Sequence, residues 1–555
     1  QDLARGASVQ DATFAAIARP RGSMSPAATE LLQRLQEGDS GLRELLLEGE
    51  AVPRSVTGLA ALGAGLAAST VLRCLRVQDD SRDLLLEVAK ALRSNTSLED
   101  LVIASSALGD EVCGLLAEAL ALNNTLRRLH LDCLAGSGLG DVAGVVLATA
   151  VRANSVLRVL NVQGACCKIG DETGRAMAAA LRVNRSLCSL RLAGRALSDD
   201  TGVALAEALQ ENSTLQHAFL AGCSIGSTGC FVAAMAKTLC TKTTALRSLA
   251  IENHHISDAS SAALAGLLWA KGSALEALHI VCAGASDSTG LALAEALGSS
   301  PPPALRELHL DGLGLQAATL LAMAVALETN MRLRSLSLLN PCLNLGPRAE
   351  AAGAALARAL RTNRSLRSLR LAFGELGDEI CVRLAEALTC NASLTTLLLH
   401  GGAVGDASIA AVARALEVNV VLRRLHLDAL YPREDHWAIQ PQGLHSTPSW
   451  PPSAPAAGGA AGVRLAAALQ RNLRLPEHWR LLTWLARKSE SSGIRRAVEA
   501  MTEQGFCHAV FAFFLPPGVA LPGLGAPRLP CGTLRLLGAD PPGRGREGAA
   551  AADAG

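Results

Sequence analysis

A short leucine-containing phrase recurs along the chain. Four of its copies have a histidine at the same position: His130, His279, His309 and His426. If neighbouring phrases form neighbouring strands, His279 and His309 lie side by side, with Glu276, Glu307, Asp311 and Cys282 close by. Imidazole, carboxylate and thiol groups together could hold a metal ion or supply a general base. We interpret these histidines instead as solvated side chains, because an open surface excludes water poorly. The sequence therefore predicts no catalytic residue, no cofactor and no metal.

Arginine fills the first variable position of nine phrases: 43, 73, 127, 158, 247, 306, 334, 367 and 423. One interpretation packs the arginine stems along a sheet and pairs their charged ends across strands. A second interpretation concerns the last four phrases, which contain no acid on the same face before Asp428. An unbalanced patch of this kind would suit an acidic partner or phosphate groups. The candidate partner-binding residues are Arg334, Arg367, Arg370, His400, Arg423, Arg424 and His426.

Other motifs for small-molecule chemistry are weak. The stretch from Gly136 to Gly144 has the spacing G-x-G-x-x-x-G, which fits a repeat turn better than a dinucleotide loop. No P-loop occurs. The 15 cysteines include no C-x-x-C pair, which favours reduced thiols and a cytoplasmic location.

The elements that position these residues come from one repeated phrase: leucine, two variable residues, leucine, one variable residue, aliphatic residue. It occurs fourteen times, once with alanine (Ala218) in place of the second leucine, from leading leucines at 42, 72, 98, 126, 157, 187, 215, 246, 275, 305, 333, 366, 394 and 422. Successive phrases are 26 to 33 residues apart, which is typical of a solenoid whose units contact only their neighbours. The predicted fold class is an α/β solenoid with parallel strands on the concave face and helices on the convex face.

Each unit predicts one strand and one helix. The phrase alternates apolar and polar residues, as a strand does. Gly-Asp pairs, as at Gly109-Asp110 and Gly170-Asp171, predict helix starts that the aspartate caps. Six Asn-x-Ser/Thr triplets precede leading leucines, and we interpret them as turns that leave a helix, not as glycosylation sites. Their asparagines are Asn95, Asn123, Asn184, Asn212, Asn363 and Asn391.

These residues resemble the ribonuclease-inhibitor class of leucine-rich repeat, over about 42–427. The pattern N-x-[ST]-L-x-x-L-x-L stands at Asn184–Leu192 and Asn391–Leu399, and the stretch from Asn363 continues into Leu376-Gly-Asp-Glu. The resemblance implies a horseshoe and a protein-binding role, as in the repeats of NOD-like receptors. The family usually places Asn or Cys three residues after the last aliphatic residue of the strand. Here most of the residues at that position are neither Asn nor Cys, which predicts that some units are looser. The residues at that position are Ser106, Leu134, Arg195, Cys223, His254, Leu313, Gly374 and Gly402.

Composition divides the chain into five parts. We expect a disordered N-terminus (1–24), a helical cap (25–41), the solenoid (42–472) with a Pro-rich loop (428–460), an aromatic helical cap (473–515) and a disordered tail (516–555). The aromatic segment either seals the last repeat or docks a partner. Whether an upstream domain precedes Gln1 stays open.

The predicted function is a non-enzymatic protein-interaction scaffold that binds a partner, possibly an acidic one, through the concave face. A net charge of +1 gives no general attraction to nucleic acid, and no segment is apolar enough to span a membrane. We expect a cytoplasmic monomer. Two alternatives are a GTPase-activating protein of the Ran-activating type and the ligand-sensing repeats of a NOD-like receptor fragment. The sequence names neither the partner nor the pathway.

Overall fold

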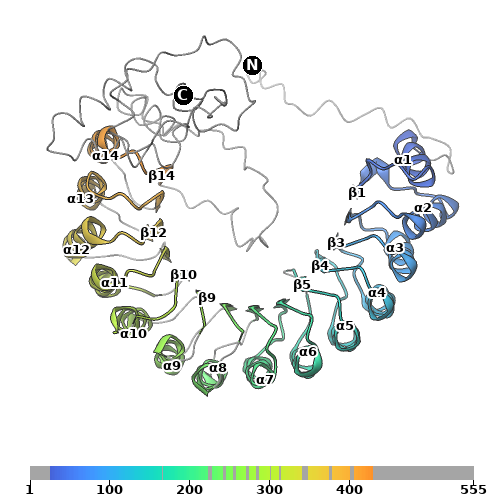
Figure 1. Cartoon of the computed structure of the whole chain (residues 1–555), viewed down its shortest axis with the longest axis horizontal. Helices are drawn as coiled ribbons and strands as arrows, with labels where there is room; N and C mark the ends of the chain where they lie inside the picture. The colour runs from blue at the N-terminus through green and yellow to red at the C-terminus, as the bar shows by residue number, and fades with distance from the viewer. Residues whose placement is uncertain are drawn as a thin grey trace, which may run out of the picture.

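The computed structural model describes residues 25–428, apart from 165–166, 223–227, 242–244, 254–257, 270–273, 283–286, 301, 312–313, 341–347, 374–377 and 401–405. These residues form one open sheet of 14 parallel strands, which follow each other in sequence order. Helices alternate with the strands, so the predicted α/β solenoid is confirmed. Figure 1 shows an arc with the strands on its inner side and the helices on its outer side.

Each strand begins two residues after a leading leucine. The strands are β1 Glu44–Glu48, β2 Cys74–Gln78, β3 Asp100–Ser105, β4 Arg128–Cys133, β5 Val159–Gln163, β6 Ser189–Ala193, β7 His217–Ala221, β8 Ser248–Asn253, β9 Ala277–Cys282, β10 Glu307–Asp311, β11 Ser335–Asn340, β12 Ser368–Phe373, β13 Thr396–His400 and β14 Arg424–Asp428. Their leucines point away from the concave face into one continuous core, as Leu366, Leu369 and Leu371 do in and before β12.

The outer layer consists of short helices. They are α1 Pro26–Gln36, α2 Val56–Ala68, α3 Arg82–Ser94, α4 Asp110–Leu122, α5 Asp141–Ala153, α6 Asp171–Val183, α7 Asp199–Leu209, α8 Cys230–Thr241, α9 Asp258–Trp269, α10 Asp287–Gly298, α11 Ala317–Thr329, α12 Ala349–Thr362, α13 Asp378–Leu388 and α14 Asp406–Val418, with a 3₁₀ turn at Gly49–Ala51. α1 lies within the range expected for the N-terminal cap, and its Leu31, Leu32 and Leu35 are buried in the same core as the repeats.

The asparagines before the leading leucines lie in turns that leave a helix, as predicted, and they are buried. Asn123 donates from Nδ2 to the carbonyls of Leu92 (2.8 Å) and Asn95 (3.0 Å) in the preceding repeat. Its Oδ1 accepts from the backbone N–H groups of Thr125 (2.9 Å) and Leu126 (2.8 Å). Equivalent asparagines, each at most 5% exposed, stand at 95, 154, 184, 212, 330, 363, 391 and 419. We call this set the asparagine ladder.

The predicted role of the Gly-Asp aspartates is wrong in one respect. Gly170 is the N-cap of α6, and Asp171 is the first residue inside the helix. Its carboxylate accepts hydrogen bonds from Ser198 and Thr201 at the start of α7, the helix of the next repeat. Asp141 bonds Gly170 and Thr173 in the same way. The aspartate therefore stabilises the start of the following helix, because that helix lies within reach of the carboxylate.

The stretch from Gly136 to Gly144 forms a repeat turn, which confirms the interpretation made from its spacing. The N–H of Gly138 donates to the carbonyl of Leu108 (3.0 Å) in the repeat before. Gly144 lies in α5 against the next helix, where a Cβ atom would be 2.0 Å from Thr173 Oγ1. Its glycine is therefore required by helix–helix packing.

Several predicted segments lie outside the described residues: 1–24, the Pro-rich loop after Asp428 with the rest of the solenoid to 472, the aromatic segment 473–515 and the tail 516–555. Within the part of the chain that the structure describes, no helix combines the length and the apolar character needed to cross a bilayer.

Candidate protein-binding surface

The arginines at the first variable position lie just before their strands, not within them as the sequence pattern suggested. Arg367 precedes β12, and its N–H donates to the carbonyl of Arg334 (2.7 Å), which precedes β11. Because this backbone bond is repeated between successive repeats, the arginines still form a column. The column runs along the edge of the sheet where each strand begins, and we call it the strand-entry edge.

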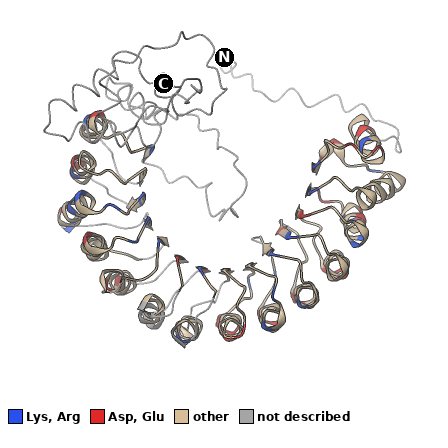
Figure 2. Ribbon diagram, viewed as in Figure 1, with Lys and Arg blue, Asp and Glu red and all other residues tan. Residues whose placement is uncertain are grey.

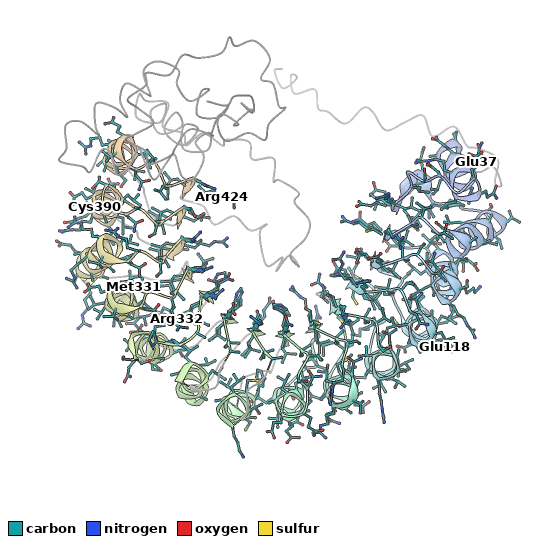
Figure 3. All side chains as sticks on the ribbon, in the orientation of Figure 1. Glu37, Glu118, Met331, Arg332, Cys390 and Arg424 are labelled. Atoms are coloured by element: carbon teal, nitrogen blue, oxygen red, sulfur yellow. The ribbon has the colours of Figure 1, made fainter. Side chains whose placement is uncertain are left out.

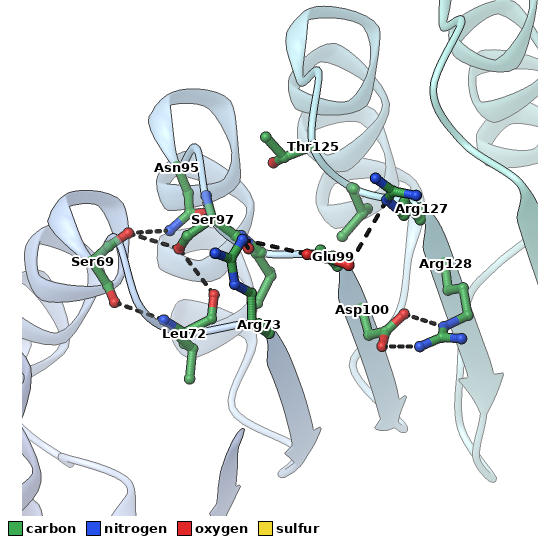
Figure 4. Close-up of polar contacts among 12 residues, drawn as sticks. Ser69, Leu72, Arg73, Asn95, Ser97, Glu99, Asp100, Thr125, Arg127 and Arg128 are labelled. Carbon is green, nitrogen blue, oxygen red and sulfur yellow. Dashed lines mark hydrogen bonds and ion pairs between the residues drawn. The ribbon is translucent and has the colours of Figure 1, made fainter. Parts of the chain in front are cut away.

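Near the N-terminus the arginines are paired with acids across the strands, as the first interpretation predicted. Glu99 lies between Arg73 (3.3 Å) and Arg127 (3.8 Å), and Asp100 receives two hydrogen bonds from Arg128 (Figure 4). Charge at this end of the concave surface is therefore largely balanced.

Further along the strand-entry edge, arginines line an open hollow of about 590 Å³. We call this hollow the arginine groove; its charged lining consists of one acid, Glu276, and the arginines 247, 306, 332, 334, 364 and 367. Glu276 lies 2.9 Å from Arg247 and 3.4 Å from Arg306, so it balances that end only. Among the described residues, no carboxylate lies within ion-pair distance of Arg332, Arg334 or Arg367.

The residues of the predicted patch do not all lie in the arginine groove. Arg334 and Arg367 line the groove, whereas Arg370 lies on β12 between Ser337 of β11 and Leu398 of β13. Arg423 and Arg424 lie two strands further along, and Arg424 is on the inner side of the arc (Figure 3). Figure 2 shows positive charge along the inner strands at this end of the arc. The side chains of His400 and His426 lie outside the described residues.

The sequence reasoning missed two groove residues, Arg332 and Arg364. Both lie in the exposed turn between a ladder asparagine and the leading leucine. Their closeness in sequence to the first variable position could have identified them. Arg332 is two residues before Arg334, and Arg364 is three residues before Arg367. The sequence alone does not show that a turn after the outer helix faces the concave side, because this depends on the register of the following strand.

The histidines at 279 and 309 are neighbours, as predicted, but they are not solvated. Their rings lie 4.1 Å apart between centroids, and His279 is 9% exposed. Burial lowers the pKa of His309 to about 3, helped by the charges of His279 and Arg370. Burial also raises the pKa of Asp311 to about 7. Glu276, expected near the histidines, pairs with the groove arginines instead, and the side chain of Cys282 lies outside the described residues.

Comparison with known proteins adds little to the geometry. No protein-family model matches the chain. No curated protein matches it either. Among solved structures, the leiomodin-1 actin-binding site 2 is 21% identical over 30% of this chain and 78% of that chain, with a TM-score of 0.22. The yeast Rad7–Elc1 complex is 17% identical over 67% of this chain and 89% of that chain, with a TM-score of 0.41.

Neither superposition is close enough to carry an argument about function. The class that the fold itself defines is an α/β repeat solenoid, in which one open sheet of parallel strands alternates with helices.

Proposed function

We propose that this protein is a non-enzymatic interaction scaffold that binds an acidic segment of a partner protein in the arginine groove. The observation that carries the proposal is the charge of the lining, with six arginines and one glutamate around an open hollow. Two of those arginines, Arg334 and Arg367, also belong to the patch predicted from the sequence.

The chemistry of the groove favours carboxylates on a flexible chain. A guanidinium group has five donors in a planar fork, which can bind a carboxylate through two parallel hydrogen bonds. A single exposed ion pair contributes only about 0.2–1 kcal/mol, so useful affinity requires several pairs at once. Successive arginines along the strand-entry edge offer such a series to a run of Asp and Glu residues.

The openness of the groove also favours binding over catalysis, because a site exposed to water cannot exclude it from a reacting bond. We further propose that the repeats belong to the ribonuclease-inhibitor class, which the Asn-x-Ser/Thr-Leu phrase supports. A cytoplasmic location is part of the same proposal and is supported by the free thiols of the described cysteines.

Fluorescence anisotropy with a labelled deca-glutamate peptide tests the proposal. We expect saturable binding that weakens steeply as the salt rises from about 50 to about 300 mM, because the Debye length then falls about 2.4-fold. The groove variant should lose at least about tenfold in affinity, since it removes several pairs of up to about 1 kcal/mol each. It carries the substitutions Arg332→Ala, Arg334→Ala, Arg364→Ala and Arg367→Ala.

The matched control removes the same charge from exposed positions on the outer helices. It carries the substitutions Arg93→Ala, Arg152→Ala, Arg175→Ala and Arg361→Ala. This control should bind like the unmodified chain. Equal loss in both variants would show that only net charge matters, and would contradict a specific groove.

A further inference from the structure

A second site stands on the strands next to the groove. His279 on β9 is directly opposite His309 on β10, and Glu307 lies two residues before His309 on the same strand. Because side chains two residues apart in a strand share a face, all three point to the concave side. One ligand atom from each of the three residues lies within 4.8 Å of the other two.

The side chain of His279 is buried, and its polar atoms are left without partners in the part of the protein that the structure describes. The side chain of His279 is 11% exposed, yet neither ring nitrogen has a hydrogen-bond partner among the described residues. The nearest carboxylate oxygen, Oε2 of Glu307, is 3.8 Å from Nε2, which is too long for a hydrogen bond. A buried polar group left in this state is costly, and a bound cation would remove that cost.

We propose that His279, Glu307 and His309 bind one divalent transition-metal ion of the zinc type. Two imidazoles and one carboxylate are a ligand set that suits Zn²⁺ and Co²⁺ and is too rich in nitrogen for Mg²⁺ or Ca²⁺. Bonds of about 2.0–2.2 Å to a tetrahedral ion would require the ligand atoms to draw together. Glu307 can do so, because its side chain is 52% exposed.

The hydroxyl of Ser335 supports the site from the next strand. Its Oγ lies 3.2 Å from Nε2 of His309. Metal-binding histidines usually bond a second group through the ring nitrogen that does not bind the metal, which fixes the ring. Ser335 can have this role if the metal is bound through Nδ1.

Three protein ligands leave a fourth position open toward the concave space. That position can take water or a donor atom of a bound protein. Glu307 directly follows Arg306, which lines the arginine groove. A partner in the groove could therefore also reach the metal, although the metal site itself does not depend on the proposed function.

Titration of the purified 555-residue chain with Co²⁺ and with Zn²⁺ tests the proposal. We expect one equivalent to bind, with a Co²⁺ absorption spectrum typical of nitrogen and oxygen ligands. Glu307→Gln, at an exposed position, should weaken binding at least tenfold while the circular dichroism spectrum stays unchanged. His279→Ala and His309→Ala should abolish binding, and bound Zn²⁺ should raise the melting temperature.

His130→Ala is the matched control, since His130 occupies the same strand position on β4 and does not belong to the cluster. It should bind the metal like the unmodified chain. The proposal is overturned if the unmodified chain binds no ion in the micromolar range or if Glu307→Gln binds as tightly as the parent. Sulfur-to-cobalt charge-transfer bands would also overturn it, because they would place the ion on cysteines.

Discussion

Single carboxylates join neighbouring repeats, and Asp171 is the clearest case. Burial opposes ionisation of Asp171, but the hydrogen bonds from Ser198 and Thr201 outweigh it, so the pKa of this carboxyl is lowered. Gly174, three residues after Asp171, makes the contact possible, because a Cβ atom at Gly174 would lie 2.1 Å from Thr201 Oγ1. A short side chain beside a small residue thus sets the spacing of two helices.

Replacement of Asp171 by Ala should lower the stability of the chain by about 2 kcal/mol at neutral pH, because hydrogen bonds to a charged group are lost. The folded-state pKa is below the unfolded value of about 3.9. The contribution is therefore present above about pH 4 and is lost as the pH falls through the folded-state pKa. Urea unfolding of the unmodified chain and of the Asp171→Ala variant, at about pH 7 and about pH 3, measures how much of this stability is lost on acidification.

Glu172→Ala is the matched control for this prediction, because Glu172 is the exposed acid next in sequence. Its effect should be within about 0.5 kcal/mol. Equal urea midpoints for the Asp171 and Glu172 variants at pH 7 would contradict the assigned role of Asp171.

At the scale of the element, helix ends are tied to the preceding repeat by the asparagine ladder. Asn123 donates two hydrogen bonds and accepts from two backbone N–H groups, so its carboxamide satisfies groups that the helix end and the turn leave open. The next residue, Asn124, is exposed. This pair allows a direct comparison.

Replacement of Asn123 by Ala should cost about 3 kcal/mol, since several buried backbone groups would lose their partners. The same replacement at Asn124 should cost less than about 0.5 kcal/mol. Chemical denaturation of both variants, followed by circular dichroism, makes the test. If the two variants unfold at the same urea concentration, the ladder does not stabilise the fold.

The elements themselves were predictable from the leucine phrase, because buried leucines in a fixed pattern specify strands and their inner face. The contacts that the polar side chains make could not be predicted from the sequence. Asp171 reaches another repeat, and Arg332 and Arg364 reach the groove, because distances between successive units decide these contacts. The burial of His279 was missed because it also depends on a neighbouring repeat. The ring of His309 stacks on the ring of His279 and excludes water from it.

At the scale of the whole molecule, the asparagine ladder is interrupted in the centre of the arc. The corresponding positions before Leu246, Leu275 and Leu305 hold Thr243, Gly272 and Pro302. Glycine and proline have no side-chain hydrogen-bonding group, and a threonine hydroxyl has one donor hydrogen where a carboxamide has two. We therefore expect the repeats between α8 and α11 to be joined less firmly than the others.

Hydrogen–deuterium exchange should reveal this difference directly. Amides of β8, β9 and β10 are expected to exchange faster than those of β4, β5 and β6, because local opening depends on the bonds that join a unit to its neighbours. Uniform protection along the sheet would show that the ladder does not set local stability.

The measurement that most directly tests the proposed function is partner capture with three forms of the chain, followed by mass spectrometry. The forms are the unmodified chain, the arginine-groove variant and the outer-helix control, all compared at equal amounts of folded protein. The proposal predicts a partner with a run of acidic residues that the unmodified chain and the control retain and the groove variant loses. Recovery of the same partners by all three forms would contradict it.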